Sequence, residues 1–264
     1  MGYPLDLSRY IKLPNRELLE ILIKQKDKSS FDISKICDII KTHNAKLIYN
    51  ITYYIDGLLH MLMFLDISDL SISTDEFIQE FKKEPLEVLE FSKSKIKGVL
   101  IDTISFPLLA GKSRVVIFRD LAYSHMIQGI REKFGSGGEA LLYYIGFESG
   151  KGFGKLHKEF AHNTGINNPF EIFNIISATF FQWAGFGKME VIEITERGGL
   201  IKVYDNFECE IMKKKSKKPY SQFIRGAITG VLSEIFNKEV SVIEEMCLAK
   251  GDDLCKFRIF FKNQ

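Results

Sequence analysis

The sequence predicts an α+β protein built from two successive domains. Three observations predict this class. The chain has 264 residues, enough to bury two separate cores. Its first ninety or so residues alternate strand-like and helix-like patterns in the order βαββαβ. Further along, long helical stretches are segregated from strands joined by tight turns, which indicates helices packed on an antiparallel sheet. We expect the first domain at residues 1–95, a linker at 96–113 and the second domain at 114–264.

The elements of the first domain follow from residue spacing and turn signals. Isoleucines and Cys37 recur at helical spacing in the first helix, and an Asp56–Gly57 turn joins two β-rich runs into a hairpin. Thr74 is the expected N-cap of the second helix. This order is the split βαβ, or ferredoxin-like, arrangement. The expected elements are a strand at 17–24, a helix at 31–43, strands at 45–54 and 58–66, a helix at 75–83 and a strand at 86–91.

With this element order and the step DKSSFDISKI from loop to helix, residues 14–93 resemble the ACT domain family. The resemblance implies a regulatory module that pairs through its sheets or helices and often binds amino acids. The family carries Pro-Gly in its ligand loop, where this chain has Ser29 and Ser30, and neither gives a ligand access to bare backbone. We therefore expect this domain to serve dimerisation or to act as a scaffold rather than to bind an amino acid.

The elements of the second domain are separated by glycine-rich and polar turns. The glycine-rich run at 135–138 (GSGG) is expected to end one helix before a longer one begins. The expected elements are a strand at 115–118, helices at 119–134, 139–160 and 169–183, strands at 188–195 and 200–207, a helix at 220–236, and strands at 240–249 and 256–261.

Three stretches of the second domain carry a second family resemblance. Residues 143–154 (YYIGFESGKGFG) and 223–236 (FIRGAITGVLSEIF) each hold two glycines four apart, which give a flat helix face for close packing. Residues 244–257 (EEMCLAKGDDLCKF) are similar to the C-terminal signature of the 4-vinyl-reductase, or hydrocarbon-binding, family. The resemblance covers roughly residues 105–264. It implies a ligand-binding dimer whose relatives include phenol-sensing bacterial activators and archaeal hydrocarbon-binding proteins.

The same resemblance implies a metal site. In the phenol-sensing relatives, three Cys and one Glu hold a zinc ion, and Glu244, Cys247 and Cys255 match three of these ligands. The remaining position falls on Ser221, whose hydroxyl is a poor zinc ligand. The fourth ligand would then be Cys209 from a neighbouring strand, a water molecule, or nothing.

Strand geometry adds a condition on this set of ligands. Alternation places Cys247 on the face of Glu245, so Glu244 joins the site only if a bulge shifts the register. Structural zinc, free thiols, and a Cys247–Cys255 disulfide all remain open from the sequence.

The resemblance also places the ligand between the helix that ends at Trp183 and the sheet. Gln182 or Trp183 stands near the position of a ligand-binding His in the sensors, and Val203 near that of a Trp, so we expect a ligand more apolar or longer than phenol. Gln182 or Trp183 would orient one polar group. Aromatic residues at helical spacing are equally a core pattern. The candidate ligand-binding residues are Phe173, Phe180, Phe181, Gln182, Trp183, Val203 and Phe207.

Composition and motifs narrow the functional class. A net charge of +2 gives no push toward nucleic acid, and neither a membrane span nor a signal peptide is evident, so we expect a cytoplasmic protein. No DNA-binding or nicotinamide motif is visible. His125, His157 and His162 form no defensible triad and are expected to be solvated or capped.

The leading hypothesis is a homodimeric sensor of a small apolar ligand that signals through a protein partner. The alternatives are an enzyme acting on a tetrapyrrole or other hydrophobic substrate, and an assembly scaffold without a ligand.

Overall fold

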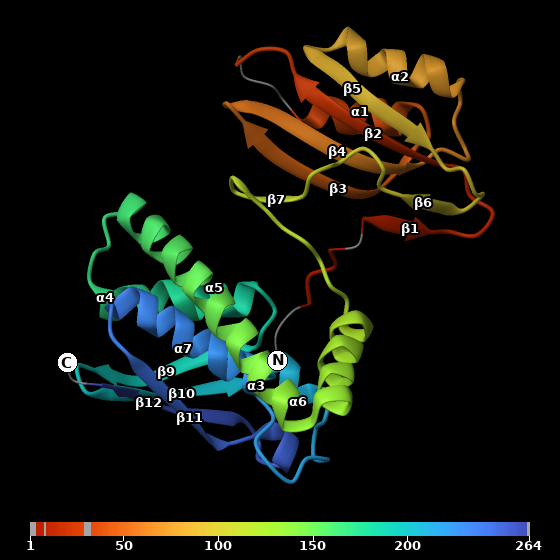
Figure 1. The fold of residues 1–264 in the computed structure, drawn as a ribbon. Helices are drawn as coiled ribbons and strands as arrows, with labels where there is room; N and C mark the ends of the chain where they lie inside the picture. The colour runs from red at the N-terminus through yellow and green to blue at the C-terminus, as the bar shows by residue number, and fades with distance from the viewer. Residues whose placement is uncertain (1–3, 8, 29–32, 263–264) are drawn as a thin grey trace. The chain divides into compact units, whose positions relative to one another are not determined.

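The computed structural model describes residues 4–7, 9–28 and 33–262, and the chain divides into two compact units, Met1–Val116 and Ile117–Gln264 (Figure 1). We call these unit 1 and unit 2. Unit 1 contains β1 (Tyr10–Lys12), β2 (Leu18–Gln25), α1 (Ser34–Thr42), β3 (Lys46–Ile55), β4 (Leu58–Asp66), α2 (Thr74–Lys83), β5 (Leu86–Lys93), β6 (Val99–Ile101), β7 (Leu109–Ala110) and β8 (Ser113–Arg114).

The main sheet of unit 1 has the order β3-β4-β2-β5, and all neighbouring strands are antiparallel. Alternate residues of the central strands face α1 and α2, which pack on the same side of the sheet around Phe77 and Phe81 (Figure 1). The opposite face buries Leu18, Leu62 and Phe64 against Leu100 of β6. Both faces of β2 and β4 are therefore covered, which explains their nearly continuous apolar sequences.

Unit 1 differs from the sequence expectations in three places. The N-cap of α2 is Ser73 and not Thr74: the Ser73 hydroxyl accepts the Glu76 N–H while the Glu76 carboxylate accepts the Ser73 N–H, forming a capping box. Residues 96–113, expected as a linker, contain β6, which pairs with β1 and so belongs to unit 1. Residues 115–118 form no strand, because pairing ends with the short β7–β8 hairpin. Ser29 and Ser30 lie outside the described residues.

Unit 2 contains α3 (Asp120–Asn163), α4 (Pro169–Glu171), a π-helical segment (Ile172–Ser177), α5 (Ala178–Trp183), β9 (Lys188–Thr195), β10 (Gly198–Tyr204), α6 (Phe207–Glu210), α7 (Gln222–Phe236), β11 (Val240–Met246), a 3₁₀ turn (Leu248–Lys250) and β12 (Cys255–Phe261). The antiparallel sheet has the order β11-β12-β10-β9. Helix α7 packs against β11, and α3 crosses α7 (Figure 1). The expected mixed α/β class with antiparallel sheets is confirmed.

The two predicted glycine faces meet each other where α3 crosses α7. A Cβ at Gly146 would stand 2.1 Å from the Phe223 carbonyl oxygen, and one at Gly230 would stand 2.1 Å from that of Phe147. No Cβ fits at such distances, so these glycines allow the two backbones to touch.

Several predicted boundaries in unit 2 move. Residues 119–134 and 139–160 form one long helical element, α3, with a kink at Gly135 (φ 55°, ψ −128°) where a stop was expected. The helix from residue 169 to 183 contains the π-helical segment. The strand expected at 200–207 ends at Tyr204, and Phe207 begins the short helix α6. Among the described residues, we find no helix with the length and apolar character that crossing a membrane requires.

Candidate metal centre and aromatic core

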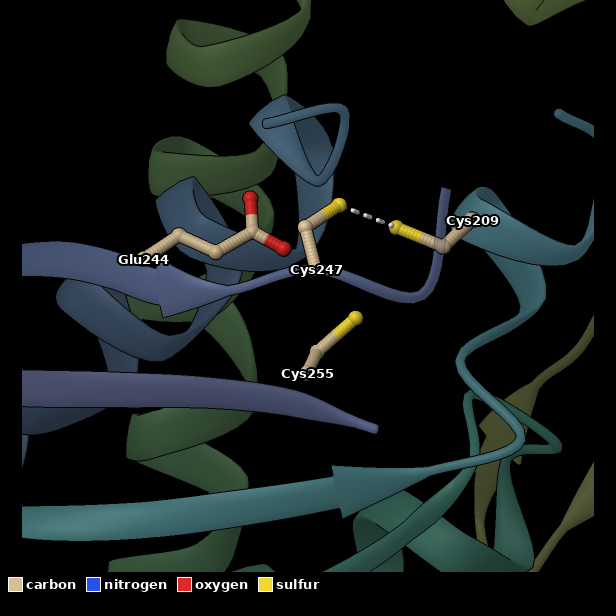
Figure 2. A group of neighbouring side chains, drawn as sticks. All are labelled: Cys209, Glu244, Cys247 and Cys255. Carbon is tan, nitrogen blue, oxygen red and sulfur yellow. Dashed lines mark hydrogen bonds between the residues drawn. The ribbon is translucent and has the colours of Figure 1, made fainter. Parts of the chain in front are cut away.

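Four metal-ligating side chains converge in unit 2, and Figure 2 shows them pointing toward a common centre. They are Cys209, Glu244, Cys247 and Cys255, and their ligand atoms all lie within 4.8 Å of one another. The three cysteines are 0% exposed and Glu244 is 9% exposed. We refer to these four residues as the cysteine cluster. They are the four residues that the sequence nominated as ligands.

Local backbone geometry explains how the four side chains come together. Cys255 is the first residue of β12 and faces inward by strand alternation. In β11 the register shifts between Glu244 and Met246, so the extra residue Glu245 lets both Glu244 and Cys247 turn inward. This is the bulge on which the inclusion of Glu244 depended. Cys209 comes from α6 and not from a strand as expected, because the chain leaves β10 at Tyr204 and turns into this helix.

Ser221 lies inside the cluster as a hydrogen-bonding residue. Its hydroxyl donates to Glu244 Oε1 at 2.7 Å and lies 2.9 Å from Cys209 Sγ. The Asn206 amide donates to the Ser221 hydroxyl at 2.9 Å and to Cys255 Sγ at 3.4 Å. Asn206 and Ser221 thus hold the donors in place from the next layer, as outer-shell groups do at metal sites.

Backbone N–H groups point at two of the three sulfur atoms. The Tyr220 N–H donates to Cys247 Sγ at 3.3 Å, and the Leu248 N–H donates to Cys255 Sγ at 3.4 Å. Hydrogen bonds to the charged form of an acid favour that form. These bonds therefore favour the thiolate, which is the form of cysteine that binds metals.

The cluster concentrates acidic groups in a buried space. Burial raises the pKa of Glu244 to about 8, and the neighbouring Cys247 sulfur acts in the same direction. The hydrogen bond to Cys247 raises the pKa of the Cys209 thiol, whereas accepting that bond lowers the pKa of Cys247. The Cys209 and Cys247 sulfur atoms are 3.5 Å apart (Figure 2). Without a cation the four groups must share protons, and a bound divalent cation would take the place of those protons.

The donor set fits a divalent metal of the zinc type. Tetrahedral zinc with Zn–S bonds of about 2.3 Å requires sulfur atoms roughly 3.8 Å apart. The observed spacings bracket that value, and all four cysteines of the chain are free of disulfides. The cysteine cluster could therefore hold a metal ion.

A buried carboxylate links this region to the start of α7. Glu208 accepts the N–H groups of Phe223 and Ile224 at 3.1 and 2.9 Å, which satisfies two donors of the first turn. Arg131 of α3 pairs with Glu208 at 2.8 Å. Burial raises the pKa of Glu208 and Arg131 opposes the rise. Sequence reasoning missed both residues, because neither stands in a recognisable capping pattern.

The predicted ligand-binding residues separate into two groups. Phe173, Phe181 and Val203 lie in the hydrophobic core, with Phe180 and Phe207 packed against it. Gln182 and Trp183 are exposed, Trp183 to 65%.

Phe186, which the sequence did not single out, is the centre of the aromatic packing. Its ring centroid lies 5.4 Å from that of Phe207, 5.5 Å from Phe181 and 6.0 Å from both Phe153 and Phe223. We call these five rings the aromatic cluster.

A buried polar pair lies beside these rings. His157 of α3 is 8% exposed, and its Nδ1 lies 3.0 Å from the Ser177 hydroxyl at the end of the π-helical segment. Its ring stacks on Phe180 at 5.1 Å. Burial lowers the pKa of His157 to about 4, so the imidazole is neutral near pH 7. His157 is thus buried rather than solvated, and its spacing within a mixed helix face gave no signal of this.

Comparison with known proteins bears on unit 2. Residues 200–261 match the vinyl-4-reductase domain family. The matched stretch runs from β10 to β12 and includes the whole cysteine cluster. It confirms the C-terminal family resemblance for these residues.

Two relatives are uncharacterized proteins of Methanocaldococcus jannaschii. One is 28% identical over 145 residues, which is 55% of this chain and 76% of the relative. The other is 33% identical over 117 residues, which is 44% of this chain and 47% of the relative. Among solved structures, the phenol-responsive sensory domain of the transcription activator PoxR, with phenol, is similar with a TM-score of 0.53 and 16% identity. That match covers 58% of this chain and 79% of the sensory domain, and it shows a shared fold.

Proposed function

We propose that unit 2 is a sensory domain that holds a structural zinc ion in the cysteine cluster and binds a small apolar molecule at the aromatic cluster. The observation that carries the proposal is the convergence of three buried thiols and one buried carboxylate from α6, β11 and β12. Zinc would supply a structural cross-link between these segments, and Cys209, Glu244, Cys247 and Cys255 would hold it.

Metal content tests the first part of the proposal. The protein should purify with about one zinc per chain, as measured by elemental analysis. Cys255→Ser removes an inward-facing ligand and should lose most of this zinc. Cys37→Ser is the matched control, because Cys37 is an exposed cysteine of unit 1, and it should keep the metal. Metal-free wild-type protein from zinc-supplemented cells would contradict the proposal.

The ligand would enter the aromatic cluster by turning rings aside, because in this structure the rings contact one another. Three features support this location: the five clustered phenylalanines, the neighbouring π-helical turn, and the buried His157–Ser177 pair, which would receive the ligand's polar group. A likeness in fold to a phenol-responsive sensory domain also supports it.

The single tryptophan of the chain gives a direct readout of binding. Trp183 contacts the ring of Phe180, their centroids being 5.8 Å apart, and Phe180 stacks on His157. Titration with phenols and with medium-chain hydrocarbons should change the emission of Trp183 in a saturable way. Phe180→Ala should weaken the response. If no compound alters either the emission or the thermal stability, the ligand proposal fails.

Unit 1 is proposed to be the ferredoxin-like, ACT-like module that supports a homodimer and a protein partner for output. The sheet order β3-β4-β2-β5, with α1 and α2 on one face, is the order that a split βαβ pair produces. The proposed domain limits are those expected from the sequence, extended to include β6.

An assembly role without a ligand is the second candidate. It is favoured by the complete burial of Phe173 and Val203, at 1% and 0% exposed, in a core that the side chains themselves fill. Native mass spectrometry of the full chain separates the two: a co-purified apolar molecule supports the sensor, and its absence together with silent titrations supports the scaffold.

A further inference from the structure

The outer face of α3, after its kink, carries large apolar side chains in the open. On the face turned away from α7, Leu141, Ile145, Leu156 and Phe160 are each between 43% and 49% exposed, and Tyr144 is 63% exposed. The inner face of the same stretch is occupied by the glycines that contact α7. About 28 Å of helix therefore presents an unpartnered apolar stripe.

The pattern along this face is nearly symmetric about its midpoint, close to residue 151. When a second α3 lies antiparallel across this point, Leu141 comes opposite Phe160 of the other copy and Ile145 comes opposite Leu156. Each apolar residue on one half of the stripe meets an apolar residue on the other half. A surface that is complementary to itself in this way fits a two-fold dimer, in which both subunits use the same patch.

The charges on the face follow the same symmetry. Glu148 and Lys155 are both exposed and stand on either side of the midpoint, at distances that match to within one residue. In the antiparallel pair, Glu148 of each copy meets Lys155 of the other, whereas a parallel pair would bring like charges together. Within its own helix Glu148 pairs with Lys151 at 3.2 Å, and such an exposed pair contributes little to stability. Glu148 can therefore turn to Lys155 of a second copy at little cost.

The centre of the face permits close approach. Gly152 is exposed, and a Cβ built there meets nothing within 4 Å in the described structure. Glycine costs helix stability of about 1 kcal/mol relative to alanine. At Gly146 and Gly150 the contact with α7 explains that cost, whereas at Gly152 nothing in the described part of the chain does.

We propose that a second copy of this chain docks on the outer face of α3, with the two helices antiparallel about residue 151. The inference rests on the homodimer in the proposed function and specifies its interface. It also places the dimer contact on α3, the helix that carries His157, so ligand binding at the aromatic cluster would be transmitted to the dimer directly.

Charge reversal with rescue tests this interface in the full chain. Glu148→Lys should weaken dimerisation by about tenfold or more in sedimentation equilibrium, because it faces Lys155 of the other copy twice per dimer. Lys155→Glu should weaken it similarly, and the double variant Glu148→Lys/Lys155→Glu should restore most of the affinity. Glu132→Lys, on α3 before the kink, is the matched control and should leave the dimer unchanged.

The outcomes separate the interface from the wider proposal. A dimer that ignores both single reversals, or that the double variant fails to rescue, places the interface elsewhere and overturns this inference alone. A wild-type chain that stays monomeric overturns the homodimer of the proposed function as well. Circular dichroism of each variant should show unchanged helix content, since all these positions are exposed.

Discussion

Ser221 and Cys209 show how one residue position can be vacated and another take over its role. The family resemblance puts a metal ligand at 221, where this chain has a hydroxyl, and the structure brings the Cys209 sulfur to 2.9 Å from that hydroxyl. The fourth donor thus comes from α6, twelve residues earlier in the chain. Sequence alone named Cys209 only as one option, because nothing in its spacing reveals the turn after β10.

This geometry predicts a rescue. Cys209→Ser should lower the zinc content and the zinc affinity, because only two thiols remain. Adding Ser221→Cys to that variant should restore one zinc per chain, since the Ser221 hydroxyl lies 3.7 Å from Cys255 Sγ and beside Glu244. Titration with a chromogenic zinc chelator measures both effects. A double variant as weak as the single one would show that Cys209 plays no part in binding the metal.

His157 predicts a pH dependence of stability. Its pKa falls to about 4 in the folded protein, below the ordinary value of 6.5. Between these values the unfolded state binds more protons, so stability is greatest above about pH 6.5 and is lost as the pH falls toward 4, by up to about 3 kcal/mol. Urea unfolding of wild type and His157→Phe across this range should show a shallower slope for the variant. Equal slopes would mean that His157 is not buried as a neutral ring.

At the scale of elements, the glycine faces of α3 and α7 were predictable and the bends of the chain were not. Two glycines four apart in each helix indicated close packing, and the structure joins those faces. The kink at Gly135, the π-helical segment and the bulge at Glu245 escaped prediction, because each depends on tertiary packing rather than on local propensity. The bulge matters most, since it brings Glu244 into the cysteine cluster.

The helix crossing predicts opposite effects for two glycine substitutions. Gly150→Ala should destabilise unit 2 by about 1–3 kcal/mol or more, because its Cβ would lie 2.2 Å from the Ala227 carbonyl oxygen. Gly129→Ala lies in the same helix with nothing within 4 Å and should stabilise it by up to about 1 kcal/mol. Thermal unfolding followed by circular dichroism compares them. Destabilisation by both substitutions would contradict the idea that the crossing, rather than the helix, requires glycine.

At the scale of the whole molecule, the two units have separate hydrophobic cores, and the cysteine cluster belongs to unit 2 alone. The fold class and the nominated metal ligands could be predicted from the sequence, because apolar periodicity and a dense motif carry them. The packing centre at Phe186 and the His157–Ser177 pair could not, since residues far apart in the chain create both.

Separate cores predict a selective response to metal removal. A strong chelator should lower the unfolding temperature of one calorimetric transition, that of unit 2, and leave the other in place, because binding to the folded state alone stabilises only the unit that binds. A chelator that shifts both transitions equally would indicate that the units unfold together.

The coordination of the metal is the most direct test of the account. X-ray absorption at the zinc edge of the purified full chain should show three sulfur ligands at about 2.3 Å and one oxygen ligand at about 2.0–2.2 Å. Cys37→Ser should leave that spectrum unchanged. A shell dominated by nitrogen or water oxygen, or protein that takes up no zinc, would contradict the assignment of Cys209, Glu244, Cys247 and Cys255 as the metal centre.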